Sequence, residues 1–234
     1  MLNSTAKRRL TALIVLLPAL FLGVDMENAE AQNVEGFPYE TRRSPAMGLR
    51  GVVATSQPLA ANAGLDILKK GGNAIDAAVA AAAVLDVTSQ NDTGIAGDLF
   101  ALVWSARDKK LYALNSAGWA PALWTPEYFK QQLGVERVPG TGINSATVPG
   151  AISGYDALLT RFGTMGFKQT FERAAQLAEE GWGQAERRHR DLGSVRTKLR
   201  NDADSNAVFL NDGEVPPLYS IVRNPDLASA LRLI

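Results

Sequence analysis

The stretch from Ala74 to Val87 constrains the fold most, because almost every residue in it is alanine, valine, leucine or isoleucine. Only Asp76 and Asp86 interrupt this apolar run. A helix that is apolar on all sides must be buried between other layers of structure. The run therefore predicts a central helix, closely packed on several sides, in a globular protein.

The residues before this run predict a strand and a second helix. The segment 52–54 (Val-Val-Ala) has the composition of a short strand. Ser56 is placed to cap a helix that carries Pro58 in its first turn, and Gly71-Gly72 ends that helix. We therefore expect the chain to enter the central helix from a tight helix–turn–helix connection.

After the central helix the pattern changes to alternating apolar residues. Segments 99–104 and 111–114 predict two strands of a β-hairpin, joined by the polar turn 106–109. Helices are predicted over 125–134, 150–162, 170–181 and 184–200, and a last one begins at Pro225. The fold class expected from this pattern is α+β and rich in helix.

The N-terminal region differs from the rest and predicts export. Basic residues at positions 7–9, an apolar run over 13–24 and small residues at 29–31 indicate a signal peptide over 1–31. The alternative, a membrane anchor, is disfavoured because the run is short and contains a proline. Residues 32–49 are predicted to form a flexible segment. We expect a periplasmic or secreted protein that has no membrane contact after cleavage.

Composition excludes several classes of function. The chain has 24 basic and 24 acidic residues, so no net charge favours nucleic acid as a partner. It has no cysteine, and His189 is the only histidine, so thiolate chemistry and a histidine-rich metal site are excluded. The basic residues over 187–200 alternate with acidic ones and are interpreted as a solvated helix face. No metal and no organic cofactor is expected.

Four segments resemble the γ-glutamyltransferase (γ-glutamyltranspeptidase) family. Together they extend the resemblance over residues 50–234. They are Gly71–Ala78 (GGNAIDAA), Thr93–Phe100 (TGIAGDLF), Val148–Ala151 (VPGA) and Pro225–Ala228 (PDLA). The first is the most specific, since two glycines release one helix and alanines begin another. The chain resembles the N-terminal part of that family's large subunit.

The resemblance implies a fold and a reaction. It implies part of the four-layer αββα sandwich of an N-terminal-nucleophile hydrolase, made as a longer precursor that cleaves itself. The nucleophile is then a threonine of the small subunit, which forms an acyl-enzyme from a γ-glutamyl amide. No catalytic residue is therefore expected within this chain. The helix predicted from Pro225 runs to Ile234 without a C-terminal cap, and we expect the rest of the domain, small subunit included, to lie beyond it.

One family feature is missing from the sequence. The resemblance implies an arginine after the second hairpin strand that grips the α-carboxylate of the substrate with two hydrogen bonds. Ala117 occupies that position, which puts glutathione-like specificity in question. Asn115 and Trp119 are candidate substrate-binding residues, with packing and capping of the turn as the simpler interpretation.

Other interpretations stay open. The substrate is expected to be a γ-glutamyl peptide or another small amide, and an acylase-type amidase of the same family is an alternative. The chain alone is expected to be inactive, and a non-catalytic fragment or interaction protein is a second alternative. The segment Gly94–Gly97 is followed by a strand and not by a helix, so it is predicted to allow close backbone contact and not to bind phosphate.

Overall fold

The computed structural model describes residues 45–234. The predicted signal peptide (1–31) lies outside the described residues, as does most of the predicted flexible segment 32–49. Residues 45–49 are exposed and form neither helix nor strand. No helix in the described part of the chain is long and apolar enough to cross a membrane.

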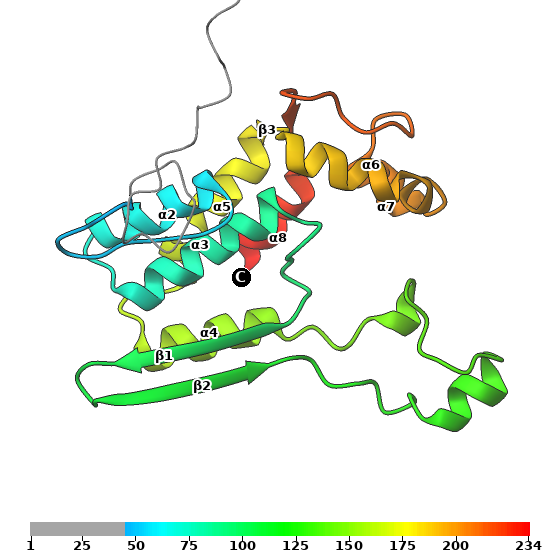
Figure 1. Ribbon diagram of the computed structural model, residues 1–234, viewed down its shortest axis with the longest axis horizontal. Helices are drawn as coiled ribbons and strands as arrows, with labels where there is room; N and C mark the ends of the chain where they lie inside the picture. Colours follow the sequence, from blue (N-terminus) through cyan, green and yellow to red (C-terminus); the bar gives the residue numbers. More distant parts are fainter. Residues whose placement is uncertain (1–44) are drawn as a thin grey trace, which may run out of the picture. The chain divides into compact units, whose positions relative to one another are not determined.

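Residues 47–234 form one compact unit of helices and two small antiparallel sheets. In chain order its elements are α2 (Pro58–Lys69), α3 (Ala74–Thr88), β1 (Leu99–Ser105), β2 (Lys110–Ser116), the π-helical turn η2 (Tyr128–Gln132), the 3-10 turn η3 (Ile143–Ser145), α4 (Ala151–Phe162), α5 (Phe167–Glu180), β3 (Trp182–Gly183), α6 (Glu186–Arg200), α7 (Ala203–Phe209), β4 (Ile221–Val222) and α8 (Pro225–Leu233). Figure 1 shows this order by colour. The helix-rich α+β composition agrees with the sequence-based prediction.

Helix α3 is the centre of the core. Asn73 caps its first turn by accepting hydrogen bonds from the amides of Ile75 (2.8 Å) and Asp76 (3.1 Å), and Asp76 accepts one from the amide of Asn73 (2.8 Å). Helices α2, α4 and α5 all contact α3 (Figure 1). The burial predicted for the stretch 74–87 is therefore confirmed, with layers on several sides.

Strands β1 and β2 form the predicted hairpin, with Leu99 opposite Ser116 and Ser105 opposite Lys110. One face packs on α4, where the rings of Tyr112 and Phe162 lie 5.1 Å apart. The other face carries Phe100, Leu102, Trp104 and Leu111, all of which are exposed. We call these four side chains the outer hairpin face.

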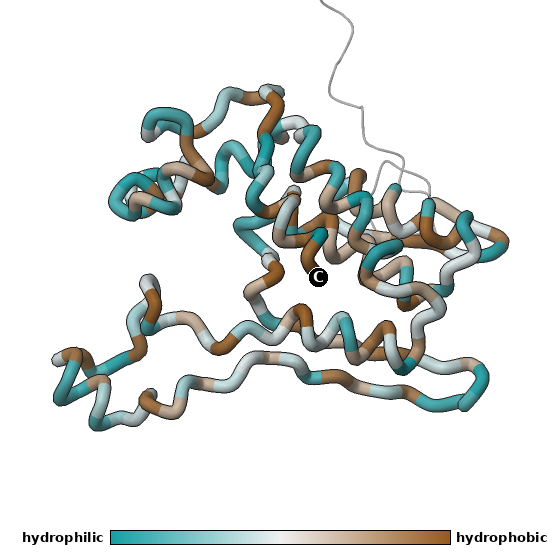
Figure 2. The backbone as a smooth tube through the Cα atoms, turned by 180° about the vertical axis from the view of Figure 1, so that it is seen from behind, coloured by the Kyte–Doolittle hydropathy of each residue, from teal (hydrophilic) through white to brown (hydrophobic). Residues whose placement is uncertain are grey.

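A second, two-residue pairing closes the C-terminal half. Strand β3 pairs with β4, so that Trp182 lies opposite Val222, and α8 packs against α5. Helix α6 consists mainly of charged and polar residues and is largely teal in Figure 2. Leu192, Val195 and Leu199 nevertheless form an inward stripe along it. Helix α7 was not predicted from the sequence.

Three local predictions need correction. Gln57, and not Ser56, caps α2, because its side chain accepts a hydrogen bond from the amide of Leu59. Segment 52–54 is not a strand, because no neighbouring strand pairs with it in the described chain; Val53 packs on the core instead, against Gly64. The helix predicted over 125–134 is mostly a π-helical turn. Its predicted start is right, since Thr125 accepts a hydrogen bond from the amide of Tyr128 (3.2 Å), and Gly134 ends it with a positive φ of 65°.

Candidate functional site

Two of the family-like segments, Thr93–Phe100 and Val148–Ala151, meet the segment after β2 at the open end of the β1–β2 hairpin. The carbonyl oxygen of Gly97 accepts hydrogen bonds from the amides of Gly150 (3.0 Å) and Ala151 (2.9 Å). The loop before β1 thus satisfies the first amides of α4, which otherwise have no partner within their helix. As predicted, the segment Gly94–Gly97 brings backbones together.

Asp98 joins the segment Thr93–Phe100 to the turn after β2 and to the residue just before Val148–Ala151. Its Oδ1 atom accepts hydrogen bonds from the amide of Gly118 (3.1 Å) and the hydroxyl of Thr147 (3.3 Å). The carbonyl of Trp119 in turn accepts one from the amide of Val148 (3.0 Å). Segments separated by about fifty residues are therefore held side by side by one carboxylate and one backbone bond.

Glycine is required where these segments touch. A Cβ atom on Gly118 would lie 1.4 Å from the carbonyl oxygen of Val148, and one on Gly150 would lie 2.1 Å from that of Ser116. Side-chain carbons never approach backbone oxygens so closely. The hydroxyl of Ser116 also donates to the carbonyl of Gly150 (2.8 Å). We call Asp98, Gly118, Thr147, Val148 and Gly150 the junction.

The predicted substrate-binding residues lie at the edge of the junction. Asn115 accepts a hydrogen bond from the amide of Ala117 (3.0 Å), which makes it a cap of its own turn. Trp119 is 86% exposed, so its ring does not pack as the simpler interpretation assumed. Ala117 is exposed between them. All three share one segment, and the side chain of Asn115 contacts the backbone of Ala117 within it.

A buried carboxyl lies behind the junction. Asp86 on α3 is 3% exposed and accepts a hydrogen bond from the hydroxyl of Tyr155 on α4 (3.1 Å). Burial raises the pKa of Asp86 to about 6, and hydrogen bonds from Tyr155 and Thr93 oppose that rise. Burial and the neighbouring Asp86 also raise the pKa of Tyr155. A carboxyl in this state is half neutral in mildly acidic solution.

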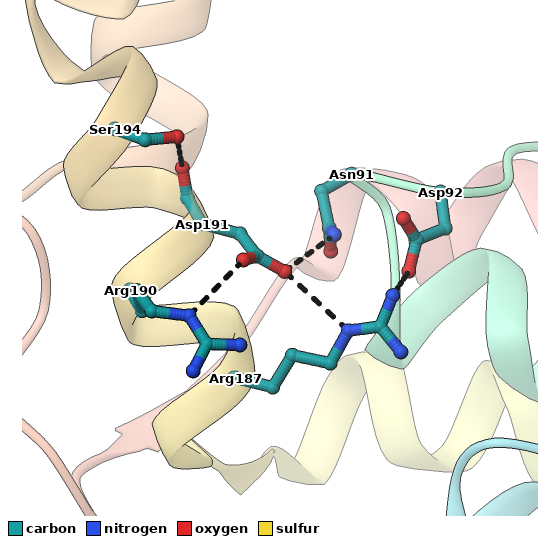
Figure 3. Close-up of polar contacts among 6 residues, drawn as sticks. All are labelled: Asn91, Asp92, Arg187, Arg190, Asp191 and Ser194. Atoms are coloured by element: carbon teal, nitrogen blue, oxygen red, sulfur yellow. Dashed lines mark hydrogen bonds and ion pairs between the residues drawn. The ribbon is translucent and has the colours of Figure 1, made fainter.

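An ion-pair network anchors the loop that leads into the junction (Figure 3). Arg187 of α6 pairs with Asp92 (3.1 Å) in that loop and with Asp191 (3.5 Å) in its own helix. The side-chain amide of Asn91 also donates to the carboxylate of Asp191 (3.2 Å). Arg190 pairs with the same carboxylate, with 3.7 Å between its Nε and Oδ1 of Asp191. These groups are partly exposed, and each such pair stabilises by at most about 1 kcal/mol.

The described residues contain no group of three or more histidine, cysteine, aspartate or glutamate side chains that would hold a metal ion. His189 lies close to the carbonyl oxygen of Pro216, with 3.0 Å between that oxygen and Nδ1. This contact uses one ring nitrogen in holding the chain. No acid–base role follows from it.

The junction residues Asp98 and Thr147 were missed as a pair by the sequence analysis. Asp98 has no role in the sequence analysis, and in the structure its carboxylate caps the amide of Gly118. The signal was its place directly before a strand, in a segment that resembles the family. Thr147 gave no signal of its own, because its partner lies 49 residues away.

Comparisons with known proteins agree with this architecture. The family profile described as "Gamma-glutamyltranspeptidase" matches residues 60–234. The chain is 36% identical over 231 residues to the glutathione hydrolase proenzyme of Bacillus subtilis, which covers 96% of this chain and 38% of that protein. It is 32% identical over 205 residues to the acylase ACY 1 proenzyme of a Pseudomonas strain, covering 84% and 36%.

Solved structures show the same relationship. The γ-glutamyltranspeptidase of Helicobacter pylori superposes with a TM-score of 0.76 at 30% identity, covering 81% of this chain and 55% of that one. A cephalosporin acylase of Bacillus halodurans superposes with a TM-score of 0.78 at 37% identity, covering 86% and 38%. The fold is therefore the helix-rich α+β part of an N-terminal-nucleophile hydrolase.

The chain belongs to the γ-glutamyltranspeptidase family. It spans 38% of the length of the Bacillus subtilis glutathione hydrolase proenzyme and 36% of that of the Pseudomonas acylase.

Proposed function

We propose that this chain is the N-terminal part of the large subunit of an exported amide hydrolase or acyltransferase of this family. The enzyme would cleave γ-glutamyl or related amide bonds through an acyl-enzyme on a threonine outside these 234 residues. The share of the relatives' length that the chain spans supports this assignment. By itself the chain would position substrate without performing the chemistry.

The junction is the observation that carries the proposal. Asp98 fixes the segment with Ala117 and Trp119 at the end of a sheet that α4 supports from behind. This gives a rigid edge against which a substrate amide would lie. Because Ala117 offers no charged donors, we infer an acyl group that is not gripped by a guanidinium at this position. The absence of a charged donor at Ala117 favours the alternative, an acylase-type substrate. Two acylases are among the proteins to which the chain is similar.

The outer hairpin face supports a role for a large partner. Phe100 and Leu102 are 67% and 74% exposed, and Asn115 pairs with Phe100 across the strands, so it lies on the same face. Exposed apolar faces of this kind are covered in a finished assembly. We infer that the remaining portion of the enzyme, small subunit included, covers this face. A non-catalytic interaction protein would use the same face and is the second candidate.

A chimera tests the catalytic proposal. Residues 50–234 would replace the matching segment of the Bacillus subtilis proenzyme, and self-cleavage and hydrolysis of a γ-glutamyl anilide and of a simple acyl anilide would be measured. We expect cleavage into two subunits and turnover of at least one amide. A chimera that folds and self-cleaves but hydrolyses neither anilide would contradict the proposal and favour the interaction protein.

Ala117 provides the test of specificity. In the active chimera, Ala117→Arg is expected to raise kcat/KM for the γ-glutamyl anilide by about tenfold or more, because a guanidinium forms two charge-assisted hydrogen bonds to a carboxylate. Ala120→Arg, three residues along the same exposed segment, is the matched control. Equal effects of the two substitutions would show that Ala117 is not at the substrate.

Export needs a separate measurement. Expression of the whole chain in a bacterial host, followed by mass spectrometry of the periplasmic or secreted fraction, is expected to find a mature N-terminus at Gln32. Retention of residues 1–31 in the cell fraction would contradict the predicted signal peptide.

A further inference from the structure

A cavity of about 120 Å³ lies between the N-terminal ends of α2 and α6, the C-terminal end of α3 and strand β3. This is far more than the roughly 10–15 Å³ needed to hold one water molecule. Ser56, Thr88, Ser89, Trp182 and Arg188 contribute to its lining. The cavity therefore has several polar groups in its lining and is large enough for a small polyatomic ligand.

Arg188 is a buried cation without an anion. Its residue is only 6% exposed, and none of the ion pairs among the described residues includes it. One side-chain hydrogen bond holds it, from Nη1 to Oε1 of Gln184, and its guanidinium carbon lies 5.6 Å from the centre of the Trp182 ring. Burial lowers the pKa of Arg188 to about 10. A buried charge of this kind is costly unless an opposite charge compensates it.

Two further donors nearby have no acceptor. The indole Nε1 of Trp182 and the amide Nε2 of Gln184 are both buried and make no hydrogen bond in the described structure. Trp182 lines the cavity beside Arg188. Native proteins rarely leave buried donors unpaired, so these atoms indicate a missing acceptor.

The start of α6 adds to the positive potential. Ala185 is its N-cap residue and provides no side-chain acceptor, so the first amides of this 15-residue helix have no side-chain cap. Ala185 also lines the cavity. The N-terminal end of a helix attracts anions through these amides and through the helix dipole.

The acidic groups at the rim are already paired. Asp92 lines the cavity, but Arg187 holds it at 3.1 Å, as Figure 3 shows. Glu186 accepts a hydrogen bond from the hydroxyl of Tyr219 (2.6 Å) and is exposed. Neither carboxylate compensates Arg188, so the interior of the cavity keeps an unmatched positive charge.

We propose that this cavity binds a small tetrahedral oxyanion, such as inorganic phosphate or sulfate. Its donors come from separate elements, with the guanidinium and amides on α6 and the indole on β3. Hydroxyls come from Ser89, which follows α3, and Ser56, which precedes α2. The hydroxyl of Thr88 is not among them, because it donates to the carbonyl of Val84 (2.8 Å). Four oxygen atoms in a tetrahedron accept from several directions at once, whereas the two oxygens of a carboxylate lie in one plane. Binding would tie β3, α6 and the start of α2 together. This inference does not rest on the proposed enzymatic activity.

Trp182 provides a direct probe. In the ¹H–¹⁵N spectrum of the whole chain, the indole signal that disappears in Trp182→Phe identifies this residue, and sodium phosphate, sulfate, acetate and chloride are titrated at constant ionic strength. We expect the Trp182 signal to shift and saturate with phosphate and sulfate only. No saturable shift with either, or equal saturation by acetate, would overturn the proposal.

Arg188→Met removes the charge and keeps an unbranched, apolar side chain in the same place. We expect it to weaken phosphate binding by about tenfold or more, since the strongest charge-assisted donor is lost. Arg196→Met is the matched control, because Arg196 lies two turns along α6, pairs with Glu214 and does not line the cavity. Unchanged phosphate affinity in Arg188→Met would also overturn the proposal.

A second readout covers the chance that a variant folds poorly. Without added anion, Arg188→Met is expected to unfold at the same temperature as the unmodified chain or higher, because an uncompensated buried charge is removed. Phosphate should raise the unfolding temperature of the unmodified chain and of Arg196→Met, and leave Arg188→Met unchanged. An equal rise in all three proteins would point to a general salt effect and contradict a site at Arg188.

Discussion

The carboxylate of Asp76 on α3 accepts a hydrogen bond of 2.6 Å from the hydroxyl of Thr164, which lies 88 residues further along the sequence. The same carboxylate accepts hydrogen bonds from the backbone amides of Thr164 (3.0 Å), Met165 (3.1 Å) and Asn73 (2.8 Å). Burial opposes its ionisation, but these donors outweigh burial and hold the pKa of Asp76 below its usual 3.8. One side chain thus joins the α2–α3 turn to the α4–α5 turn.

Asp76→Ala is therefore expected to lower the free energy of unfolding by about 3 kcal/mol or more, because several buried donors lose their acceptor at once. Urea unfolding at neutral pH measures this. Since the folded pKa is depressed, the stabilisation is present at neutral pH and is lost only as the pH falls through the folded pKa. Asp66→Ala is the control, as Asp66 pairs only with exposed Lys69 and should cost less than about 1 kcal/mol. Similar losses in both variants would show that the Asp76 network is not structural.

The glycines of the junction predict a second result. Gly118→Ala should destabilise the chain by several kcal/mol or prevent folding, because its Cβ would meet the carbonyl oxygen of Val148. Gly140→Ala provides the comparison, since nothing lies within 4 Å of its Cβ position. It should be neutral or stabilising by about 0.4–1 kcal/mol, because alanine restricts the unfolded chain. Thermal unfolding of the two variants checks this, and a tolerated Gly118→Ala would mean that the junction is loose in solution.

The two faces of the hairpin should respond differently to the same change. Leu102→Ser is expected to alter the free energy of unfolding by no more than about 0.5 kcal/mol, because Leu102 is 74% exposed. Val103→Ser should cost about 1–2 kcal/mol, since Val103 packs against the core.

Self-association gives the complementary measurement. If the outer hairpin face is an uncovered interface, Leu102→Ser combined with Trp104→Ser should lower the association of the isolated chain, measured by sedimentation velocity. Val103→Ser should not lower it. Association that is unaffected by the double substitution would argue against this face as the place where a partner binds.

The sequence pattern predicted those helices and strands whose formation depends mainly on residues close in sequence. Helix α3 was predicted because a long apolar run of this composition leaves few other structures, and the hairpin because its apolar residues alternate. Segment 52–54 has the right composition for a strand, but a strand exists only with a partner, which no local pattern reveals.

The contacts that build the candidate sites depend on distant residues and escaped prediction. Arg187 and Arg188 are neighbours with the same side chain, yet one is exposed in an ion pair and the other is buried on the inward stripe with Leu192. Helical period alone places Arg188 and Leu192 on one side, four residues apart. Because residues 187–200 are rich in charged side chains, the whole segment was interpreted from the sequence as a solvated helix face, and this spacing was not used. The pairing of Asp86 with Tyr155 likewise spans 69 residues.

Asp86 leads to a prediction about pH. Because burial raises its folded pKa from 3.8 to about 6, ionisation of Asp86 costs stability. Its stabilising contribution is complete below the unfolded pKa and is lost as the pH rises through about 6. The shift corresponds to about 3 kcal/mol between the two ends of this range.

Asp86→Asn keeps an oxygen that accepts from Tyr155 and removes the charge. We expect it to exceed the unmodified chain in free energy of unfolding by up to about 3 kcal/mol at about pH 7.5 and to match it at about pH 4. Urea unfolding across this range measures the difference, with Asp156→Asn as the control, since Asp156 follows Tyr155 on α4 but is exposed. A difference that is independent of pH would mean that Asp86 ionises at its ordinary pKa in the folded chain, with water reaching the space between α3 and α4.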